Sequence, residues 1–345
     1  MHSNRPAPSG AGHRPLVSVL GASGYLGSVV VARLAQLPVR LRAVSRRRGP
    51  VPDQTVADVE VCPADLTDSR CLADAVADAD VILHLGKHSG GWRDADSPEG
   101  ERVNVGIVRD LTEILGRRRA AGPPPLVVFA ATTSQVGRPP EHPMNGSEPD
   151  RPETAYDRQK LTAEGLLKAA TEASVLRGVS LRLPTIFGQS WLSSVPDQGV
   201  VTAMARRAIA GRPLTMWHDG TVKRDLVYVE DAADAFLAAM REPQDLTGRH
   251  WLVGTGRHDT VGAVFRTVAA SVAEHTGEPA VPVTSVPAPA HAPVIDFLSV
   301  TIDPAPFQLA SGWHAQTALD EAVDRTVAAL LEREETTTKE PHVRT

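Results

Sequence analysis

Short apolar runs alternate with amphipathic segments along most of the chain. The runs lack the strict in-out alternation of a half-buried strand, so we expect strands that are covered on both faces. Amphipathic segments of helical period fill most of the gaps, and right-handed crossovers between such strands give a parallel sheet. The pattern predicts an α/β fold, a doubly wound parallel sheet, with strands at residues 16–20, 39–44, 59–62, 81–85, 126–130 and 180–183.

The chain of 345 residues, 42% of them hydrophobic, exceeds one typical domain and suits a sheet domain with a smaller C-terminal substrate-binding lobe. We expect the sheet domain at 15–188, with a return segment at 225–255. The lobe is expected at 189–224 and 256–332. The polar ends, 1–14 and 333–345, are expected to be disordered tails.

The net charge of -5 argues against a nucleic acid or a membrane surface as partner. Cys62 and Cys71 are the only cysteines, too few for a disulfide framework or a zinc site, so we expect no metal and a reducing, cytoplasmic compartment. No apolar run is long enough to span a bilayer, and the opening residues lack the apolar core of a signal peptide.

A glycine-rich segment follows the first expected strand and precedes a helix. Gly21, Gly24 and Gly27 let the chain turn sharply, and backbone amides at a helix N-terminus bind phosphate. In this context the segment predicts a dinucleotide-binding loop of the Rossmann type, whereas an ordinary tight turn is the simpler alternative.

The second expected strand ends in Ser45, followed by the basic run 46–48. A site that prefers NAD would place Asp or Glu here for the ribose hydroxyls, whereas guanidinium groups bind a 2′-phosphate. The sequence therefore predicts NADPH/NADP as cofactor, although a solvated basic loop would explain Arg47 or Arg48 singly. Asp65, after the third strand, would cap the next helix, face the adenine, or do both.

Tyr156 and Lys160 stand four residues apart in a helical segment, so the phenol and the ammonium share one face. A nearby cation favours the phenolate, which suits a proton-exchanging group, whereas a surface tyrosine with a solvated lysine is the simpler explanation. Thr132 follows the fifth strand, at the sheet edge where such folds bind ligands. We expect Thr133 and Ser134 to shape that loop, and His84, at a strand end, to be packed and hydrogen-bonded.

These motifs occur in the order and spacing of a known family, together with the segments 182–188 and 224–231. Residues 16–332 resemble an extended short-chain dehydrogenase/reductase that acts on nucleotide sugars. The segments 39–46, 102–106 and 213–220 resemble more closely the dTDP-4-keto-6-deoxyhexose 4-ketoreductases of antibiotic deoxysugar biosynthesis, of the L-mycarose type.

The resemblance implies a role for each matching residue. Tyr156 would be the general acid, Thr132 a second donor to the sugar carbonyl, and Lys160 a ligand of the nicotinamide ribose that stabilises the phenolate. The implied cofactor-binding residues are Gly21, Ser23, Gly24, Tyr25, Leu26, Gly27, Ser45, Arg46, Asp65, Leu66, Leu85 and Lys160. The implied substrate-binding residues are Thr132, Tyr156, Thr185, Gln189, Trp217 and Arg224, with Trp217 on the base and Arg224 on the diphosphate.

Two departures bear on the reaction. Thr133 and Ser134 stand where related 4,6-dehydratases carry Asp-Glu, so water elimination is not expected. Thr185 stands where many relatives carry Asn. The expected reaction is NADPH-dependent reduction of the C4 ketone of a dTDP-linked 4-keto-deoxyhexose by a homo-oligomer. A nucleotide-sugar 4-epimerase and a non-catalytic NADP(H)-binding sensor remain alternatives; the C4 configuration of the product and the contacts of the 88–92 loop stay undecided.

Overall fold

Seven parallel strands form the central sheet of the computed structural model, which describes residues 14–90, 94–118, 122–189, 195–217, 219–289 and 294–339. The spatial order is β11-β6-β5-β4-β1-β2-β3, with every pairing parallel. The strands are β1 (Leu16–Leu20), β2 (Arg40–Ser45), β3 (Asp58–Pro63), β4 (Val81–His84), β5 (Leu126–Thr132), β6 (Arg177–Leu183) and β11 (His250–Leu252). All six predicted strands are present, each within three residues of its expected ends.

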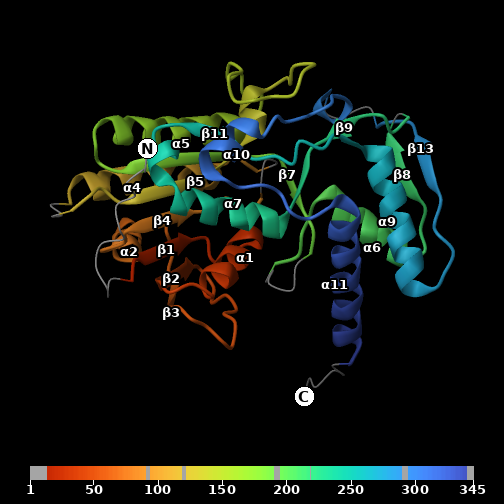
Figure 1. Cartoon of the computed structure of the whole chain (residues 1–345), viewed down its shortest axis with the longest axis horizontal. Coiled ribbons are helices and arrows are strands. Elements are labelled where there is room, and N and C mark those ends of the chain that lie inside the picture. Colours follow the sequence, from red (N-terminus) through yellow and green to blue (C-terminus); the bar gives the residue numbers. More distant parts are fainter. Residues whose placement is uncertain are drawn as a thin grey trace, which may run out of the picture.

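Helices cover both faces of this sheet (Figure 1). Alternate strand residues face opposite layers: Val17 and Val19 pack with the α1 and α7 side, while Leu16 and Leu20 pack with α2, α4 and α5. The covering helices are α1 (Tyr25–Leu34), α2 (Ser69–Val76), α4 (Ile107–Gly116), α5 (Ala155–Glu172) and α7 (Val229–Arg241). Because both faces are buried, the strands read as continuous apolar runs, and the predicted doubly wound α/β class is confirmed.

The chain runs from β1 through β2 to β3 and then crosses back to β4 on the other side of β1. The crevice at the carboxyl ends of β1 and β4 is where this class of sheet binds its ligands. Short elements border that edge. They are α3 (Pro98–Glu101), the π-helix η1 (Arg102–Gly106) and the 3-10 helix η2 (Thr133–Val136).

A smaller group of elements lies beyond β7, at the right of Figure 1, and packs α6 and α11 against α9. Its two-stranded sheets pair β8 with β13 and β12 with β9, while β10 pairs with β7. The remaining bounds are β7 (Thr185–Phe187), α6 (Val200–Ile209), β8 (Leu214–Trp217), β9 (Lys223–Arg224), β10 (Leu226–Tyr228), α8 (Pro243–Leu246), β12 (Asp259–Thr260), α9 (Val261–Thr276), β13 (Val283–Val286), η3 (Val294–Phe297), α10 (Ala305–Ser311) and α11 (Leu319–Lys339). The division of the chain into domains stays a prediction.

The expected C-terminal tail was wrong for residues 333–339. The helix α11 continues through them to Lys339. The first turns of α11 are anchored by buried residues such as Val327 and Leu330, and adding a residue to an existing helix is far easier than starting one. Residues 1–13 and 340–345, the other parts of the expected tails, lie outside the described residues.

Candidate active site

The glycine loop between β1 and α1 has no room for side chains. A Cβ atom on Gly21, whose φ is +92°, would lie 2.8 Å from the amide nitrogen of Gly86. A Cβ on Gly27 would lie 2.1 Å from the Gly21 carbonyl oxygen. Gly24 is the N-cap of α1 and makes no side-chain capping bond, so the first turn of α1 keeps its N–H groups for an anion. The loop therefore fits a dinucleotide pyrophosphate.

The other residues expected in this loop have distinct surroundings. The Tyr25 hydroxyl donates to the Gly188 carbonyl oxygen at 2.5 Å, which ties the start of α1 to the end of β7. Burial, reinforced by the charge of Asp197, raises the pKa of Tyr25. Leu26 packs against the core, and Ser23 lies against Gly49. Tyr25 thus has a structural partner in addition to its expected place beside the cofactor.

Replacing Gly27 by alanine is expected to weaken NADPH binding at least about tenfold. The added Cβ meets a backbone carbonyl, which no side-chain rotation relieves, so the loop itself must move. Fluorescence titration with NADPH measures the effect. Gly165→Ala on α5 is the matched control, because a Cβ added there would have nothing within 4 Å. Equal NADPH affinity in Gly27→Ala and the native protein would contradict the loop's assignment.

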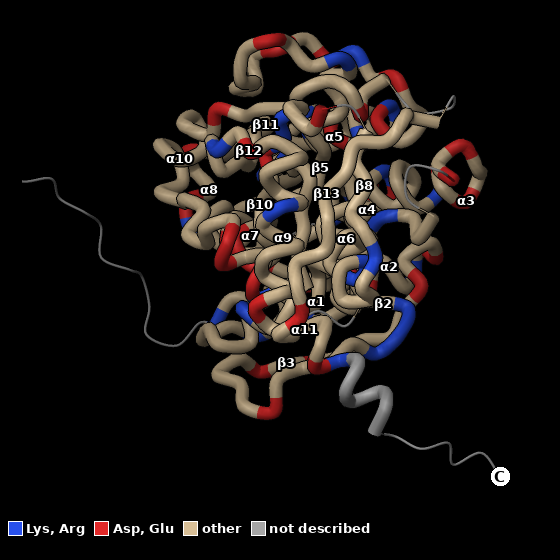
Figure 2. Tube along the Cα trace, turned by 90° about the vertical axis from the view of Figure 1, so that its right-hand side faces the viewer, with Lys and Arg blue, Asp and Glu red and all other residues tan. Residues whose placement is uncertain are grey.

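The end of β2 is basic and exposed. Arg46, Arg47 and Arg48 are all exposed, and Figure 2 shows a blue stretch beside the β2 label. Ser45 is buried, and its hydroxyl donates to the Arg47 carbonyl oxygen at 2.6 Å. A hydroxyl has one proton to donate. In this conformation the arginines, and not Ser45, are free to donate to a phosphate.

Asp65 lies after β3, close enough to Arg46 for that charge to lower its pKa. The larger causes of the lowered pKa are hydrogen bonds from the Thr67 amide and hydroxyl, at 3.0 and 2.8 Å. Asp65 does not cap α2, since Asp68 does so through bonds from the amides of Arg70 and Cys71. The capping alternative for Asp65 was therefore wrong. Two other expected cofactor residues belong to different apolar clusters, Leu66 buried in one and Leu85 partly buried against the other.

The helix α5 begins in a capping box that positions the expected catalytic pair. Thr154 is the N-cap, and its hydroxyl and the Asp157 carboxylate each accept from the other's amide. Lys160 is 2% exposed, and its Nζ donates to the Ala130 carbonyl oxygen of β5 at 2.9 Å. The same Nζ lies 5.8 Å from the centroid of the Tyr156 ring. The predicted helical pair therefore exists and is held against the fifth strand.

Burial dominates the electrostatics of this pair. It lowers the pKa of Lys160 to about 7, with a further contribution from the charge of Lys87. Burial and the charge of Asp157 raise the pKa of Tyr156 well above its ordinary value. The expectation that Lys160 brings this pKa toward neutrality was thus wrong for the protein alone. Desolvation and the charge of Asp157 both oppose the phenolate, so Tyr156 holds its proton at neutral pH.

His84 lies beneath Lys160 in β4. Burial and the charge of Lys160 lower the pKa of His84 to about 3, so the imidazole is neutral. Its Nδ1 accepts from the Gly86 amide at 3.3 Å, and its ring packs 5.5 Å from Phe129. The prediction that His84 is packed is confirmed, and the predicted hydrogen bonding holds for Nδ1 only, since Nε2 is buried without a partner among the described residues.

Thr132 ends β5 and begins η2 in a second capping box. Its Oγ1 lies 2.8 Å from Ser134 Oγ, and Ser134 Oγ donates to Asp157 Oδ1 at 2.5 Å. The neighbouring Thr133 hydroxyl donates to the Leu183 carbonyl oxygen, as expected of a residue that shapes the loop. Ser134 instead joins the loop to the start of α5 through its side chain.

The sequence analysis, which argued from residue chemistry, did not identify Asn104 as a member of the site. It is 1% exposed, in the π-helix η1; its Oδ1 accepts from the His88 amide and its Nδ2 donates to Gln159 Oε1 at 2.8 Å. Gln159 in turn donates to the Ala95 carbonyl oxygen. Asn104 and Gln159 thus join η1 to α5 next to Tyr156. A π-bulge is frequent at functional sites, but no sequence pattern predicts where one forms.

The residues expected to bind substrate lie in different surroundings. Trp217 ends β8, and its ring centroid lies 6.1 Å from that of Phe297. The Arg224 guanidinium donates to the carbonyl oxygens of Ile295, Asp296 and Leu298. The 295–298 segment thus links the two residues expected on the base and the diphosphate. Both terminal nitrogens of Arg224 are therefore engaged, and only its Nε–H is left for a diphosphate until that segment moves.

Thr185 and Gln189 differ in accessibility. Thr185 is exposed in β7, free to meet a ligand. Gln189 is 1% exposed, and its Oε1 accepts from the Asp197 amide at 3.2 Å. Gln189 is therefore bound into the segment that leads to α6, a role its sequence position did not suggest. Of the 88–92 loop, Gly91 and Trp92 lie outside the described residues.

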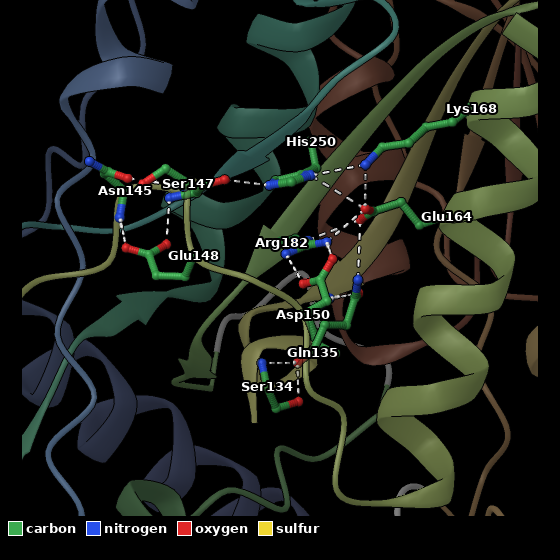
Figure 3. Close-up of polar contacts among 12 residues, drawn as sticks. Ser134, Gln135, Asn145, Ser147, Glu148, Asp150, Glu164, Lys168, Arg182 and His250 are labelled. Atoms are coloured by element: carbon green, nitrogen blue, oxygen red, sulfur yellow. Dashed lines mark hydrogen bonds and ion pairs between the residues drawn. The ribbon is translucent and has the colours of Figure 1, made fainter. Parts of the chain in front are cut away.

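A buried ion network supports α5 in the turns that follow Lys160 (Figure 3). Arg182 and Glu164 are fully buried, and Arg182 Nε and Nη2 donate to the two carboxylate oxygens of Glu164 at 3.0 and 2.8 Å. Arg182 also holds Asp150 through both terminal nitrogens, at 2.7 and 2.9 Å. Lys168 reaches Glu164 at 3.0 Å and His250 at 3.1 Å. The network binds α5 to β6 and β11 and so fixes the helix that carries the pair.

Neither a metal cluster nor a membrane span occurs among the described residues. No group of three or more His, Cys, Asp and Glu side chains among them is arranged to hold a metal ion. No helix in that same part of the chain has the length and apolarity needed to cross a membrane.

Comparison with known proteins agrees with this architecture. A UDP-glucose 4-epimerase of Mycolicibacterium smegmatis is 28% identical over 319 residues, 90% of this chain and 96% of that protein. A dTDP-6-deoxy-L-talose 4-dehydrogenase (NAD(P)(+)) of Kitasatospora kifunensis is 28% identical over 319 residues, 89% and 93% of the two chains. The structure of Thermus thermophilus UDP-glucose 4-epimerase in complex with NAD superposes with a TM-score of 0.73 at 25% identity, covering 92% and 99%. The model of the NAD dependent epimerase/dehydratase family matches residues 17–254, and the chain belongs to that family.

Proposed function

We propose that the protein reduces, with NADPH, the C4 ketone of a dTDP-linked 4-keto-6-deoxyhexose or its 2,6-dideoxy form. The observation that supports reduction most directly is the state of Tyr156. A phenol is already protonated at neutral pH, burial raises the pKa of Tyr156 further, and ketone reduction requires a proton donor at the carbonyl oxygen. Lys160 lies beside the same ring and can stabilise the phenolate left after proton transfer.

Each residue at the site would then have a separate role in the reduction. A bound nicotinamide would supply the hydride. Tyr156 would donate a hydrogen bond to the C4 oxygen and release its proton as negative charge develops there. Lys160, fixed by the Ala130 carbonyl, would hold the nicotinamide ribose and supply positive charge to the phenolate. Thr132 would contact the C4 oxygen from the end of β5.

The substrate class is proposed from the relatives and from the lobe. Both named relatives act, by their names, on nucleotide-linked sugars at C4. The neighbouring rings of Trp217 and Phe297 would offer a flat apolar surface to the base. Arg224 would bind the diphosphate after the 295–298 segment releases it. A homo-oligomer stays a prediction.

The preference for NADPH is proposed on the exposed arginines after β2. The double variant Arg46→Ala/Arg47→Ala is expected to raise the KM for NADPH about tenfold or more, because charge-assisted bonds to the 2′-phosphate are lost. The KM for NADH, which lacks that phosphate, should stay the same and serves as an internal control. Arg40→Ala, at the opposite end of β2, is the matched charge control. An equal rise for both cofactors would contradict the assignment.

A nucleotide-sugar 4-epimerase is the second candidate, because a relative that matches 90% of this chain carries that name. The two reactions differ in stoichiometry, since an epimerase consumes no NADPH. Loss of NADPH absorbance with dTDP-4-keto-6-deoxyglucose, one equivalent per product, would support the reductase. Interconversion of UDP-glucose and UDP-galactose without cofactor consumption would favour the epimerase and reject net reduction.

A further inference from the structure

Tyr156, the acid of the proposed reaction, lies in the first turn of α5, and the ends of helices fray. Within the described part of the chain no hydrogen bond fixes the Tyr156 hydroxyl, so its place depends on the backbone of that turn. Lys160, in the next turn, is held separately by the Ala130 carbonyl oxygen of β5. The place of the phenol relative to the ammonium therefore depends on what holds the first turn.

Asp157 holds the first turn of α5 through two bonds. Its Oδ2 accepts from the Thr154 hydroxyl at 2.7 Å, within the capping box. Its Oδ1 accepts from the Ser134 hydroxyl at 2.5 Å, and Ser134 belongs to η2, which follows β5. Asp157 is 5% exposed, so water competes little for these bonds, and a bond to an ionised acceptor is roughly twice as strong as one between neutral groups. The first bond stabilises the turn, and the second fixes it against another segment.

The bond from Ser134 gives α5 a second attachment to the segment that begins with β5. With the bond from Lys160 to Ala130 alone, the start of the helix could pivot about one point of attachment. We infer that Ser134 and Asp157 are positioning residues, whose hydrogen bond fixes the turn of Tyr156 against the end of β5 and is needed for a full rate of reduction. The inference rests on the proposed function, in which Tyr156 is the acid.

Positioning and simple stabilisation predict different results for Ser134→Ala. This variant removes the bond to η2 and leaves the capping box and the charge of Asp157 in place. A bond that only stabilises the fold would change the melting temperature but not the chemical step. A bond that positions the acid would change kcat with little change in binding, because a small displacement of a reacting group costs orientation.

Steady-state kinetics with NADPH and dTDP-4-keto-6-deoxyglucose provide the first test. Ser134→Ala is expected to lower kcat about tenfold, with both KM values within twofold of native. Ser134→Thr keeps the hydroxyl and should restore the native kcat. Thr162→Ala is the matched control, because it removes a hydroxyl of α5 that donates to the Arg158 carbonyl oxygen and takes no part in the bond to η2.

The variants Asp157→Ala and Ser134→Ala/Asp157→Ala test whether the two residues act through their bond. Asp157→Ala should lower kcat at least as much as Ser134→Ala, since it also removes a bond of the capping box. Adding Ser134→Ala to it should lower kcat by no more than a further twofold, because the bond is already lost. A native kcat in Ser134→Ala, or full additivity in the double variant, would overturn the inference and leave the proposed function standing.

Hydrogen exchange provides a test that needs no substrate. The amides of Asp157 and Arg158 donate to the Thr154 hydroxyl and carbonyl oxygens, each at 3.1 Å. Ser134→Ala should speed their exchange about tenfold in the protein alone, whereas Thr162→Ala should leave it unchanged. Unchanged exchange in Ser134→Ala would overturn the inference. Faster exchange in that variant, with no reduction of the sugar by the native protein, would instead overturn the proposed function.

Discussion

Replacing Tyr156 by phenylalanine is expected to lower kcat for ketone reduction about 10²- to 10⁴-fold, the range typical of losing a positioned general acid. The ring and its packing remain, so the protein should fold and bind NADPH as before. Lys160 also keeps its bond to the Ala130 carbonyl oxygen. The rate of single-turnover reduction should therefore fall, while the affinity for NADPH stays the same.

Tyr228→Phe provides the matched control for this variant. Tyr228 is more deeply buried than Tyr156, at 2% exposure, and it lies in β10 and packs against Phe187. Its substitution removes the same hydroxyl from the same kind of side chain, with an expected change in kcat of no more than a few-fold. Native kcat in Tyr156→Phe would rule out Tyr156 as the acid.

Replacing Arg182 by methionine is expected to destabilise the protein by about 3–5 kcal/mol, the cost of leaving a buried partner charge uncompensated. The side chain is fully buried and holds Glu164 and Asp150, each through two nitrogens (Figure 3). Chemical denaturation measures the loss. The double variant Arg182→Met/Glu164→Gln should recover part of it, because the fully buried carboxylate of Glu164 is then a neutral amide and only the partly exposed carboxylate of Asp150 lacks its arginine. Equal loss in the single and double variants would contradict this account.

The ion pair between Arg182 and Glu164 also predicts how the free energy of unfolding changes at acid pH. Burial alone would raise the pKa of Glu164, but hydrogen bonds from His250 and Arg182 and the nearby positive charges outweigh burial and lower it. A carboxyl whose pKa is lower in the folded state stabilises the fold above its unfolded pKa, about 4.3, and loses that contribution as the pH falls toward the folded pKa. The native protein should thus lose stability below about pH 4.3 more steeply than the double variant.

Much of the architecture was accessible from local pattern. Continuous apolar runs identified six strands because parallel strands buried on both faces need no polar alternation. Spacing identified the pair of Tyr156 and Lys160, since residues four apart share a helix face. The strand β11 was not predicted, because three residues are too few to show a hydrophobic pattern and its partner β6 is distant in sequence.

What the sequence by itself determined is the fold class, the glycine loop and the residue types at the sheet edge, because each depends on neighbours along the chain. Only the tertiary structure decided the states of those residues. Desolvation raises the pKa of Tyr156, and contacts between β5 and α5 join Thr132 to Asp157 through Ser134. Arg224 likewise matched an expected diphosphate ligand, yet its terminal nitrogens donate to the 295–298 carbonyls. Burial and hydrogen-bond partners depend on contacts between segments far apart in sequence, so the spacing of residues along the chain does not predict them.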